Sequence, residues 1–271
     1  MSLFYNKTEY TNRDHTFVIC AYKESKYLDE CIQSLLCQTV ETNIIMATST
    51  PNDYIVSYAE RYGFKLFVND GETGIAGDWN FALSCAETPL VTIAHQDDIY
   101  EPKYAETMLK CVNKASNPVL FSSAYGEIRN GKKVFSNRLL NIKKILVVPM
   151  RLLPDSIAAR RLSLAFGDSI SCPTVTYVKK YITEYPFESG LRAALDWQQW
   201  EKMSKIPGTF VYSPEPLMCH RIHAESETSH IIGENSRGEE NYEIFRKFWP
   251  APVAKILNRA YSDSEKSNVV S

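Results

Sequence analysis

Residues 17–38 read FVICAYKESKYLDECIQSLLCQ and contain one complete strand–helix unit. The first five residues are apolar and include β-branched side chains, which is typical of a buried strand. A polar turn follows, and Ser25 is the predicted N-cap of the helix behind it. The apolar residues of this helix recur at positions that share one face: Leu28, Cys31, Ile32, Leu35 and Leu36.

The same alternation continues through the first hundred residues. Further strands are predicted at 42–48, 64–68 and 89–94, and further helices at 53–62 and 77–87. Strands that alternate with helices predict an α/β fold with a mostly parallel central sheet flanked by helices. Ligands bind at the carboxyl ends of such strands. The loops to be expected there are 21–25, 48–53, 69–78 and 95–102.

The second half of the chain is less regular and predicts a smaller mixed region. A hairpin is expected around Asn130-Gly131, between strands at 119–128 and 133–135. Other apolar runs predict strands at 172–178 and 209–212 and a helix at 193–203. The C-terminal part, 240–260, is predicted to be helical with interruptions at Pro250 and Pro252.

Composition excludes several classes of protein. The formal net charge of -2 gives no basic footprint for nucleic acid. The seven cysteines form no C-x-x-C pair, so reduced, buried thiols are expected rather than a zinc or disulfide framework. The N-terminus lacks the apolar core of a signal peptide, and the apolar runs are too short to span a bilayer. A cytoplasmic protein is therefore expected.

Two adjacent carboxylates, Asp97 and Asp98, follow the predicted strand at 89–94. Neighbouring buried carboxylates are costly unless positive charge neutralises them. Mn²⁺ or Mg²⁺ that binds with a diphosphate supplies that charge, because hard cations prefer oxygen ligands. The alternative is structural, with Asp98 as the N-cap of a helix that begins near Pro102.

Five segments together resemble family 2 glycosyltransferases of the GT-A fold. Each is weak alone, but they occur in the order of that family. The first two are an opening strand and loop at 18–28 and a helix end at 31–39; the third is the segment 74–83. The fourth is the Asp-Asp region at 93–102. The fifth has two parts, Leu195-Asp196-Trp197 and the closing element His220-Arg221-Ile222-His223-Ala224-Glu225-Ser226.

The resemblance implies roles for individual residues. Ala21, Tyr22 and Glu24 would border the base and ribose, with Thr48 and Ser49 facing the nucleotide and Asp78 near the ribose and donor sugar. Asp97 and Asp98 would hold the metal and diphosphate. His223 would close the site against the metal or diphosphate, with Arg221 supporting charge. Asp196 would be the general base.

The implied protein is a non-processive, inverting transferase. It would move a sugar from a nucleotide-sugar donor, with UDP as the default nucleotide, to a hydroxyl of a glycan or a lipid-linked sugar. Surface polysaccharide or glycan assembly is the implied context. The resemblance implies a single domain at 1–235, with a nucleotide half at about 14–120 and an acceptor half at 121–235, and a helical tail at 236–271.

The sequence departs from the family pattern at three places. His95 and Leu195 stand where the family often has acidic residues, and the second strand ends in Ala47-Thr48-Ser49 rather than in Asp. A protein of the same fold that binds a sugar nucleotide without turnover is therefore the alternative. A nucleotidyltransferase is a weaker rival, because residues 21–25 do not form a Gly-rich phosphate loop.

Several remaining residues favour structural roles. His220 is expected to be structural, and His15 and His230 carry no argument for function. Trp79, Trp197 and Trp200 are expected in the core, and Asp168 and Glu188 are expected to be solvated loop carboxylates. Residues 138–151 and 245–249 mix cations with apolar side chains, so either could contact an anionic membrane or form a core helix with a solvated edge.

Overall fold

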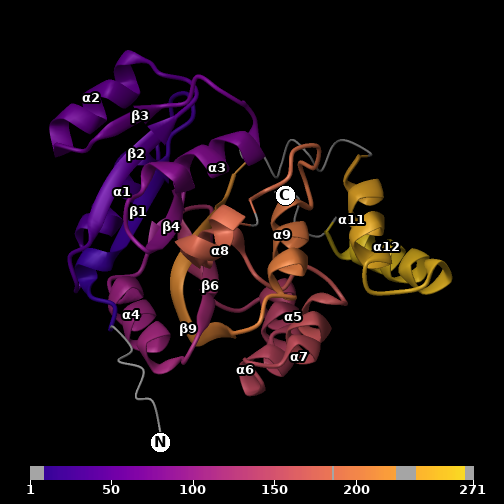
Figure 1. The fold of residues 1–271 in the computed structure, drawn as a ribbon. Helices are drawn as coiled ribbons and strands as arrows, with labels where there is room; N and C mark the ends of the chain where they lie inside the picture. The colour runs from indigo at the N-terminus through magenta and orange to yellow at the C-terminus, as the bar shows by residue number, and fades with distance from the viewer. Residues whose placement is uncertain (1–8, 185, 224–235, 266–271) are drawn as a thin grey trace, which may run out of the picture.

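The computed structural model describes residues 9–184, 186–223 and 236–265, and these form an α/β structure around one curved sheet (Figure 1). The sheet has nine strands in the order β3-β2-β1-β4-β8-β6-β9-β5, with β7 paired to β6. The strands are β1 His15–Cys20, β2 Asn43–Thr48, β3 Leu66–Val68, β4 Leu90–His95, β5 Ile99–Tyr100, β6 Pro118–Arg129, β7 Lys132–Val134, β8 Thr176–Val178 and β9 Thr209–Ile222.

The α-helices alternate with the strands in the first half and cluster in the second. They are α1 Leu28–Leu36, α2 Asp53–Tyr62, α3 Ile75–Cys85, α4 Tyr104–Lys114, α5 Arg138–Leu146, α6 Val148–Leu152, α7 Ile157–Leu164, α8 Lys179–Glu184, α9 Leu195–Met203, α11 Ser236–Arg246 and α12 Ala251–Glu265. The last two form the expected helical tail, and the division at residue 235 stays a prediction. The interruption expected at Pro252 is wrong, because Pro252 lies in the first turn of α12, where a backbone N–H would have no partner in the helix. No helix in the described ranges has the length and apolarity to cross a membrane.

The first half is the parallel sheet that the sequence predicts. β1 pairs in parallel with β2 and β4, and β2 pairs in parallel with β3. Alternate residues of β1 enter different cores: Phe17 and Ile19 pack with α1, α2 and α4, whereas Val18 packs with α3 and α9. The period of two along the strand thus separates the two helical layers.

The second half is mixed and contains the largest departures from expectation. β8 pairs antiparallel with β4 and β6, whereas β6 and β9 are parallel. β9 is far longer than the expected strand at 209–212, because it continues through Pro214 and Pro216 with a register shift between Ser123 and Ala124 of β6. Proline residues in a sequence usually predict the end of a strand. Here a bulge accommodates them, and the strand continues.

The structure shows the caps of two helices, and one predicted cap is wrong. Asn52 caps α2 by accepting a hydrogen bond from Ile55 N, and Gly63 ends it with φ 67°. Ser25 is not the N-cap of α1, since that position is Tyr27, and Leu36 is 48% exposed rather than in the core. At Asn130-Gly131 both φ values are positive, 50° and 74°, as the predicted hairpin requires. All seven cysteines are free thiols.

Candidate functional site

A cavity of about 1250 Å³ opens at the carboxyl ends of β1, β2 and β4. The nucleotide half supplies one wall, and α5, α9 and the segment before β8 supply the other. Residues of the first wall that the sequence singles out are Ala21, Tyr22, Glu24, Thr48, Ser49, Asp78 and Asp97. Lys143, Asp168 and Asp196 line the second wall. The volume exceeds that of a typical small-molecule pocket and leaves room for two substrates.

The loop after β1 is held in place by its neighbours. Tyr22 N donates to Gln96 Oε1 at 3.0 Å, and Gln96 Nε2 donates back to Tyr22 O at 2.9 Å. Lys23 has a left-handed φ of 53°, and its N–H donates to Thr50 Oγ1 at 2.6 Å. The amide of Gln96 therefore ties the loop after β1 to the loop after β4, which carries the two carboxylates.

Asp78 is fixed at the start of α3 by two donors. Ser49 Oγ donates to its Oδ2 at 2.8 Å and Asn69 Nδ2 donates to its Oδ1 at 2.9 Å. These partners come from the carboxyl ends of β2 and β3, so the loops after two neighbouring strands meet at one carboxylate of α3. Such an anchored acceptor group is suited to binding ribose or sugar hydroxyls.

Asp97 lies beside β9. Its Oδ2 is 2.8 Å from His223 Nε2, and its backbone O accepts from Arg221 Nε at 2.8 Å. Burial acts to raise the pKa of Asp97, but the His223 hydrogen bond and nearby His220 and His95 hold it below its usual value. Arg221 is in turn held by Glu30 at 2.5 Å and lies over the Tyr27 ring at 4.2 Å.

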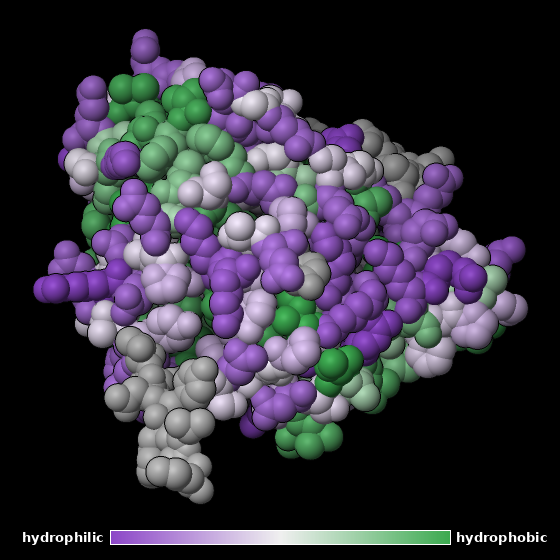
Figure 2. All heavy atoms as spheres, viewed as in Figure 1, coloured by the Kyte–Doolittle hydropathy of each residue, from purple (hydrophilic) through white to green (hydrophobic). Residues whose placement is uncertain are grey.

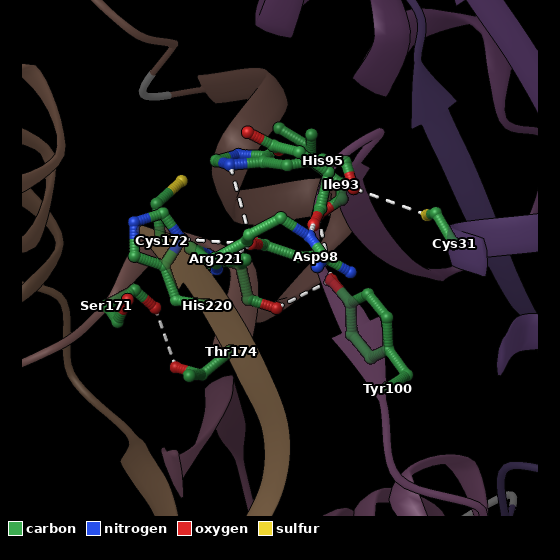
Figure 3. Close-up of polar contacts among 12 residues, drawn as sticks. Cys31, Ile93, His95, Asp98, Tyr100, Ser171, Cys172, Thr174, His220 and Arg221 are labelled. Atoms are coloured by element: carbon green, nitrogen blue, oxygen red, sulfur yellow. Dashed lines mark hydrogen bonds and ion pairs between the residues drawn. The ribbon is translucent and has the colours of Figure 1, made fainter. Parts of the chain in front are cut away.

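Asp98 is completely buried and does not line the cavity. Its Oδ1 accepts from Arg221 N at 2.9 Å and is 2.9 Å from His220 Nδ1 (Figure 3). The alternative reading of Asp98 as a helix cap is wrong, because α4 begins after Lys103. His220 confirms its expected structural role by bonding Asp98, and it also borders the cavity.

The donor atoms fit a divalent cation that arrives with a nucleotide. No set of three or more His, Cys, Asp or Glu side chains in the described residues forms a ready metal cage. Asp97 Oδ2 and His223 Nε2 are nevertheless 2.8 Å apart, near the roughly 3 Å between neighbouring ligands of an octahedral ion. Asp98 Oδ2 accepts no hydrogen bond within the described part of the chain. An ion of the Mg²⁺ type needs only one or two protein carboxylates when phosphates complete its shell.

The opposite wall holds a second charged cluster. Lys143 Nζ of α5 is 3.7 Å from Asp168 Oδ2, and both side chains are less than one fifth exposed. Burial raises the pKa of Asp196, and the cation of Lys143 opposes that rise. Burial and the negative charge of Asp196 raise the pKa of Asp168 further, well above its usual value.

We expect the stability of the protein to fall between about pH 6.5 and pH 9 because of His220. Burial acts to lower the pKa of His220, but the charge and hydrogen bond of Asp98 raise it to about 9 from 6.5. A group whose pKa is higher in the folded than in the unfolded protein contributes its full stabilisation at pH values below the unfolded-state pKa. This stabilisation is lost as the pH rises through the folded-state pKa. The loss should be roughly 2–3 kcal/mol.

Urea unfolding at about pH 6 and pH 9.5 measures this loss. His220→Gln should lower the free energy of unfolding at the lower pH and flatten the dependence. An equally steep dependence in His220→Gln would show that another group causes it.

Comparison with known proteins identifies the family of the chain. The family described as Glycosyl transferase family 2 matches residues 16–188, which is more than half of the chain. The chain belongs to glycosyltransferase family 2. The match contains β1 except His15, the Asp97-Asp98 loop and the Lys143–Asp168 pair, but not Asp196 or β9.

Curated relatives are also glycosyltransferases. An uncharacterized glycosyltransferase of Haemophilus influenzae is 24% identical over 263 residues, covering 94% of this chain and 77% of that protein. Another, of Rickettsia felis, is 25% identical over 225 residues, covering 81% of this chain but 36% of that protein.

Solved structures share the GT-A fold of this glycosyltransferase. S. aureus TarS 1-349 in complex with UDP-GlcNAc superposes with a TM-score of 0.63 at 15% identity, covering 90% of this chain and 70% of that one. The mannosyltransferase PcManGT from Pyrobaculum calidifontis, in complex with GDP-Man and Mn²⁺, superposes with a TM-score of 0.65 at 15% identity. This match covers 93% of this chain and 70% of that one. At a sequence identity of 15%, the structural similarity establishes the fold and nothing more.

The structure brings most of the predicted site residues of the glycosyltransferase together. Among them, only Asp98 and Arg221 do not line the cavity, and they lie beneath it. Residues 224–226 of the predicted closing element, and His230, lie outside the described residues. Trp197 and Trp200 are buried as expected. Trp79 and Trp197 both border the cavity, and Trp79 stacks on His95 at 5.3 Å.

Sequence reasoning missed Gln96 and Lys143 and misjudged Asp168. Asp168 is not a solvated carboxylate, because it is mostly buried and pairs with Lys143. Glu188 is solvated as expected, with 56% of its side chain exposed. The signal for Gln96 was its place between His95 and Asp97; nothing in the sequence ties Lys143 to Asp196, which is 53 positions away.

Proposed function

We propose that this family 2 glycosyltransferase moves a single sugar from a nucleotide-sugar donor, a UDP-sugar by default, to an acceptor hydroxyl with inversion. The observation that carries the proposal is that Asp78, Asp97 and Asp196 line one cavity from two walls. The first two belong to the nucleotide half and the third to the acceptor half. The catalytically inactive nucleotide-sugar binder remains the rival that the experiments below separate.

In this proposal the nucleotide wall binds and orients the donor. Ala21, Tyr22 and Glu24 border the base and ribose, Thr48 and Ser49 face the nucleotide, and Asp78 accepts hydrogen bonds from ribose or sugar hydroxyls. Arg221 positions the Asp97 loop through Asp97 O and Glu30. These contacts pre-organise the donor before the acceptor arrives.

Asp97, Asp98 and His223 would hold Mn²⁺ or Mg²⁺. When bound, such an ion neutralises the charge that develops on the diphosphate as the sugar leaves. The complexes of TarS with UDP-GlcNAc and of PcManGT with GDP-Man and Mn²⁺ support this choice of donor class and metal.

Asp196 takes the proton of the attacking hydroxyl in this scheme. A carboxylate within hydrogen-bond reach of the nucleophile acts as general base, and Lys143 favours its ionised form. Attack from the acceptor wall, opposite the departing diphosphate, inverts the anomeric centre. The acceptor is a hydroxyl of a glycan or a lipid-linked sugar in surface polysaccharide or glycan assembly, within the cytoplasm.

Release of nucleoside diphosphate from a panel of nucleotide sugars tests the proposal. We expect one donor to be hydrolysed slowly without acceptor, and only when Mn²⁺ or Mg²⁺ is present. Asp97→Ala should reduce this release by about 10²-fold or more, because it removes the carboxylate ligand that borders the cavity. Tight binding of a donor with no release under any condition, and with candidate acceptors present, would favour the inactive binder.

A further inference from the structure

Helices α5, α6 and α7 form an exposed apolar face. We define this α5–α7 face by six side chains that are each at least 40% exposed: Ile145, Val148, Leu152, Leu153, Ile157 and Leu162. Leu152, Ile145 and Leu153 are 71%, 69% and 61% exposed, which is unusual for residues of this size. Figure 2 shows hydrophobic side chains gathered over α6 and α7 at the lower right. Contiguous exposed apolar surface marks an interaction site.

The charge of this region differs from that of the whole chain. Residues 138–166 contain six Lys or Arg and a single acid, Asp155, although the chain as a whole has a net charge of -2. Arg138, Lys144 and Arg151 are exposed beside the apolar residues. A surface that combines apolar side chains with cations is complementary to the headgroups and acyl boundary of an anionic bilayer.

The same cations argue against a second copy as the occupant. A twofold contact through this face would place one cationic patch against another, because an isologous interface pairs the same surface with itself. We propose that the α5–α7 face docks on an anionic lipid surface. The sequence alternative for residues 138–151, a core helix with a solvated edge, holds only for the inner residues such as Leu140 and Met150.

The other candidate membrane segment does not provide such a face. Phe245 is fully buried and packs on Trp197 at 4.8 Å. Trp249 Nε1 donates to Ala165 O at 2.7 Å. Two of the three aromatic side chains in residues 245–249 are thus engaged with the protein itself.

Helix α5 connects this surface with the acceptor wall. Leu139 and Lys143, one turn apart, line the cavity, whereas Ile142 and Ile145 are exposed on another side of the helix. A bilayer at the α5–α7 face would therefore lie one helix away from Asp196. The docking itself does not depend on the proposed transfer activity. If the proposed function holds, docking implies that the acceptor is lipid-linked and is presented at the membrane surface.

Co-sedimentation with vesicles tests the docking. The full chain should sediment with vesicles of equal parts phosphatidylcholine and phosphatidylglycerol, and much less with phosphatidylcholine alone or at high salt. Leu152→Glu combined with Leu153→Glu should weaken binding by about tenfold or more. Ile256→Glu is the matched control, because Ile256 is 70% exposed on α12 and is not one of the six side chains of this face; this variant should bind like the wild type.

Circular dichroism and donor hydrolysis show whether the double variant is folded and has an intact donor site. Equal binding to both kinds of vesicle, or wild-type binding by the folded double variant, overturns the proposal. A wild-type dimer that the double variant dissociates would instead assign the face to a second copy. A wild-type chain that hydrolyses donor but does not bind the anionic vesicles fails only this inference, whereas wild-type vesicle binding without any donor turnover fails only the proposed function.

Discussion

Asp196→Asn should reduce sugar transfer by about 10²–10⁴-fold, the usual contribution of a general base. Asparagine keeps the size and one oxygen of the side chain, so the hydrogen bond from Trp197 N to Asp196 Oδ1 can persist. The amide cannot accept the proton of the attacking hydroxyl. Donor affinity, measured by calorimetry with Mn²⁺, should change little because the nucleotide wall is untouched.

Glu188→Gln is the matched control for this substitution. Glu188 is also an acid near the start of α9, but its side chain is 56% exposed and pairs with Lys202 at 3.0 Å. Near-normal transfer is expected for it. If Asp196→Asn retains transfer within a few-fold of the wild type, Asp196 is not the base; if the wild type itself binds donor and turns over none, the chain is a binder.

Lys143→Met should shift the acidic limb of the activity profile to higher pH. The cation of Lys143 opposes the rise that burial imposes on the pKa of Asp196, so its removal leaves Asp196 protonated over a wider range of pH. A protonated carboxylate cannot act as base. We expect a loss of about tenfold at pH 6 and a much smaller loss at pH 9.

The effect of Asp168→Asn should have the opposite sign. This substitution removes the carboxyl group that pairs with Lys143 Nζ at 3.7 Å. The cation then acts on Asp196 without that competitor, so the acidic limb should shift to lower pH. Lys144→Met is the control, since Lys144 is the exposed neighbour of Lys143 and donates to Phe135 O. Losses that are uniform across pH in Lys143→Met and Asp168→Asn would mean that the pair is structural only.

The sequence was sufficient for the nucleotide half because its signals are local. The apolar run at residues 17–21, the polar turn and the helical spacing from Leu28 to Leu35 each act within a few residues. Parallel strands must place their carboxyl ends at the same edge of the sheet. The sequence alone therefore predicts that the loops carrying Thr48, Ser49, Asp78 and Asp97 lie close together. The Asn52 cap and Gly63 end of α2 are equally local.

Helix ends were less predictable where backbone geometry competes with side-chain preference. Ser25 has the chemistry of an N-cap, but its backbone O accepts from Leu28 N within the preceding turn. The helix therefore begins after Tyr27. Leu36 fits the helical spacing of its neighbours yet lies half exposed at the last turn, where the core no longer covers it.

What the sequence by itself determined is the alternating α/β order, the family, and the residues that its short motifs carry. Only the tertiary structure decided that β9 continues through Pro214 to place His220 and Arg221 on Asp98 and His223 on Asp97, and that α5 brings Lys143 to Asp168 beside Asp196. The physical reason is the separation along the chain of the residues that determine each property. Strand and helix periodicity is set by neighbours in the chain, whereas the charge and burial of a carboxylate are set by groups that only folding brings within a few ångströms.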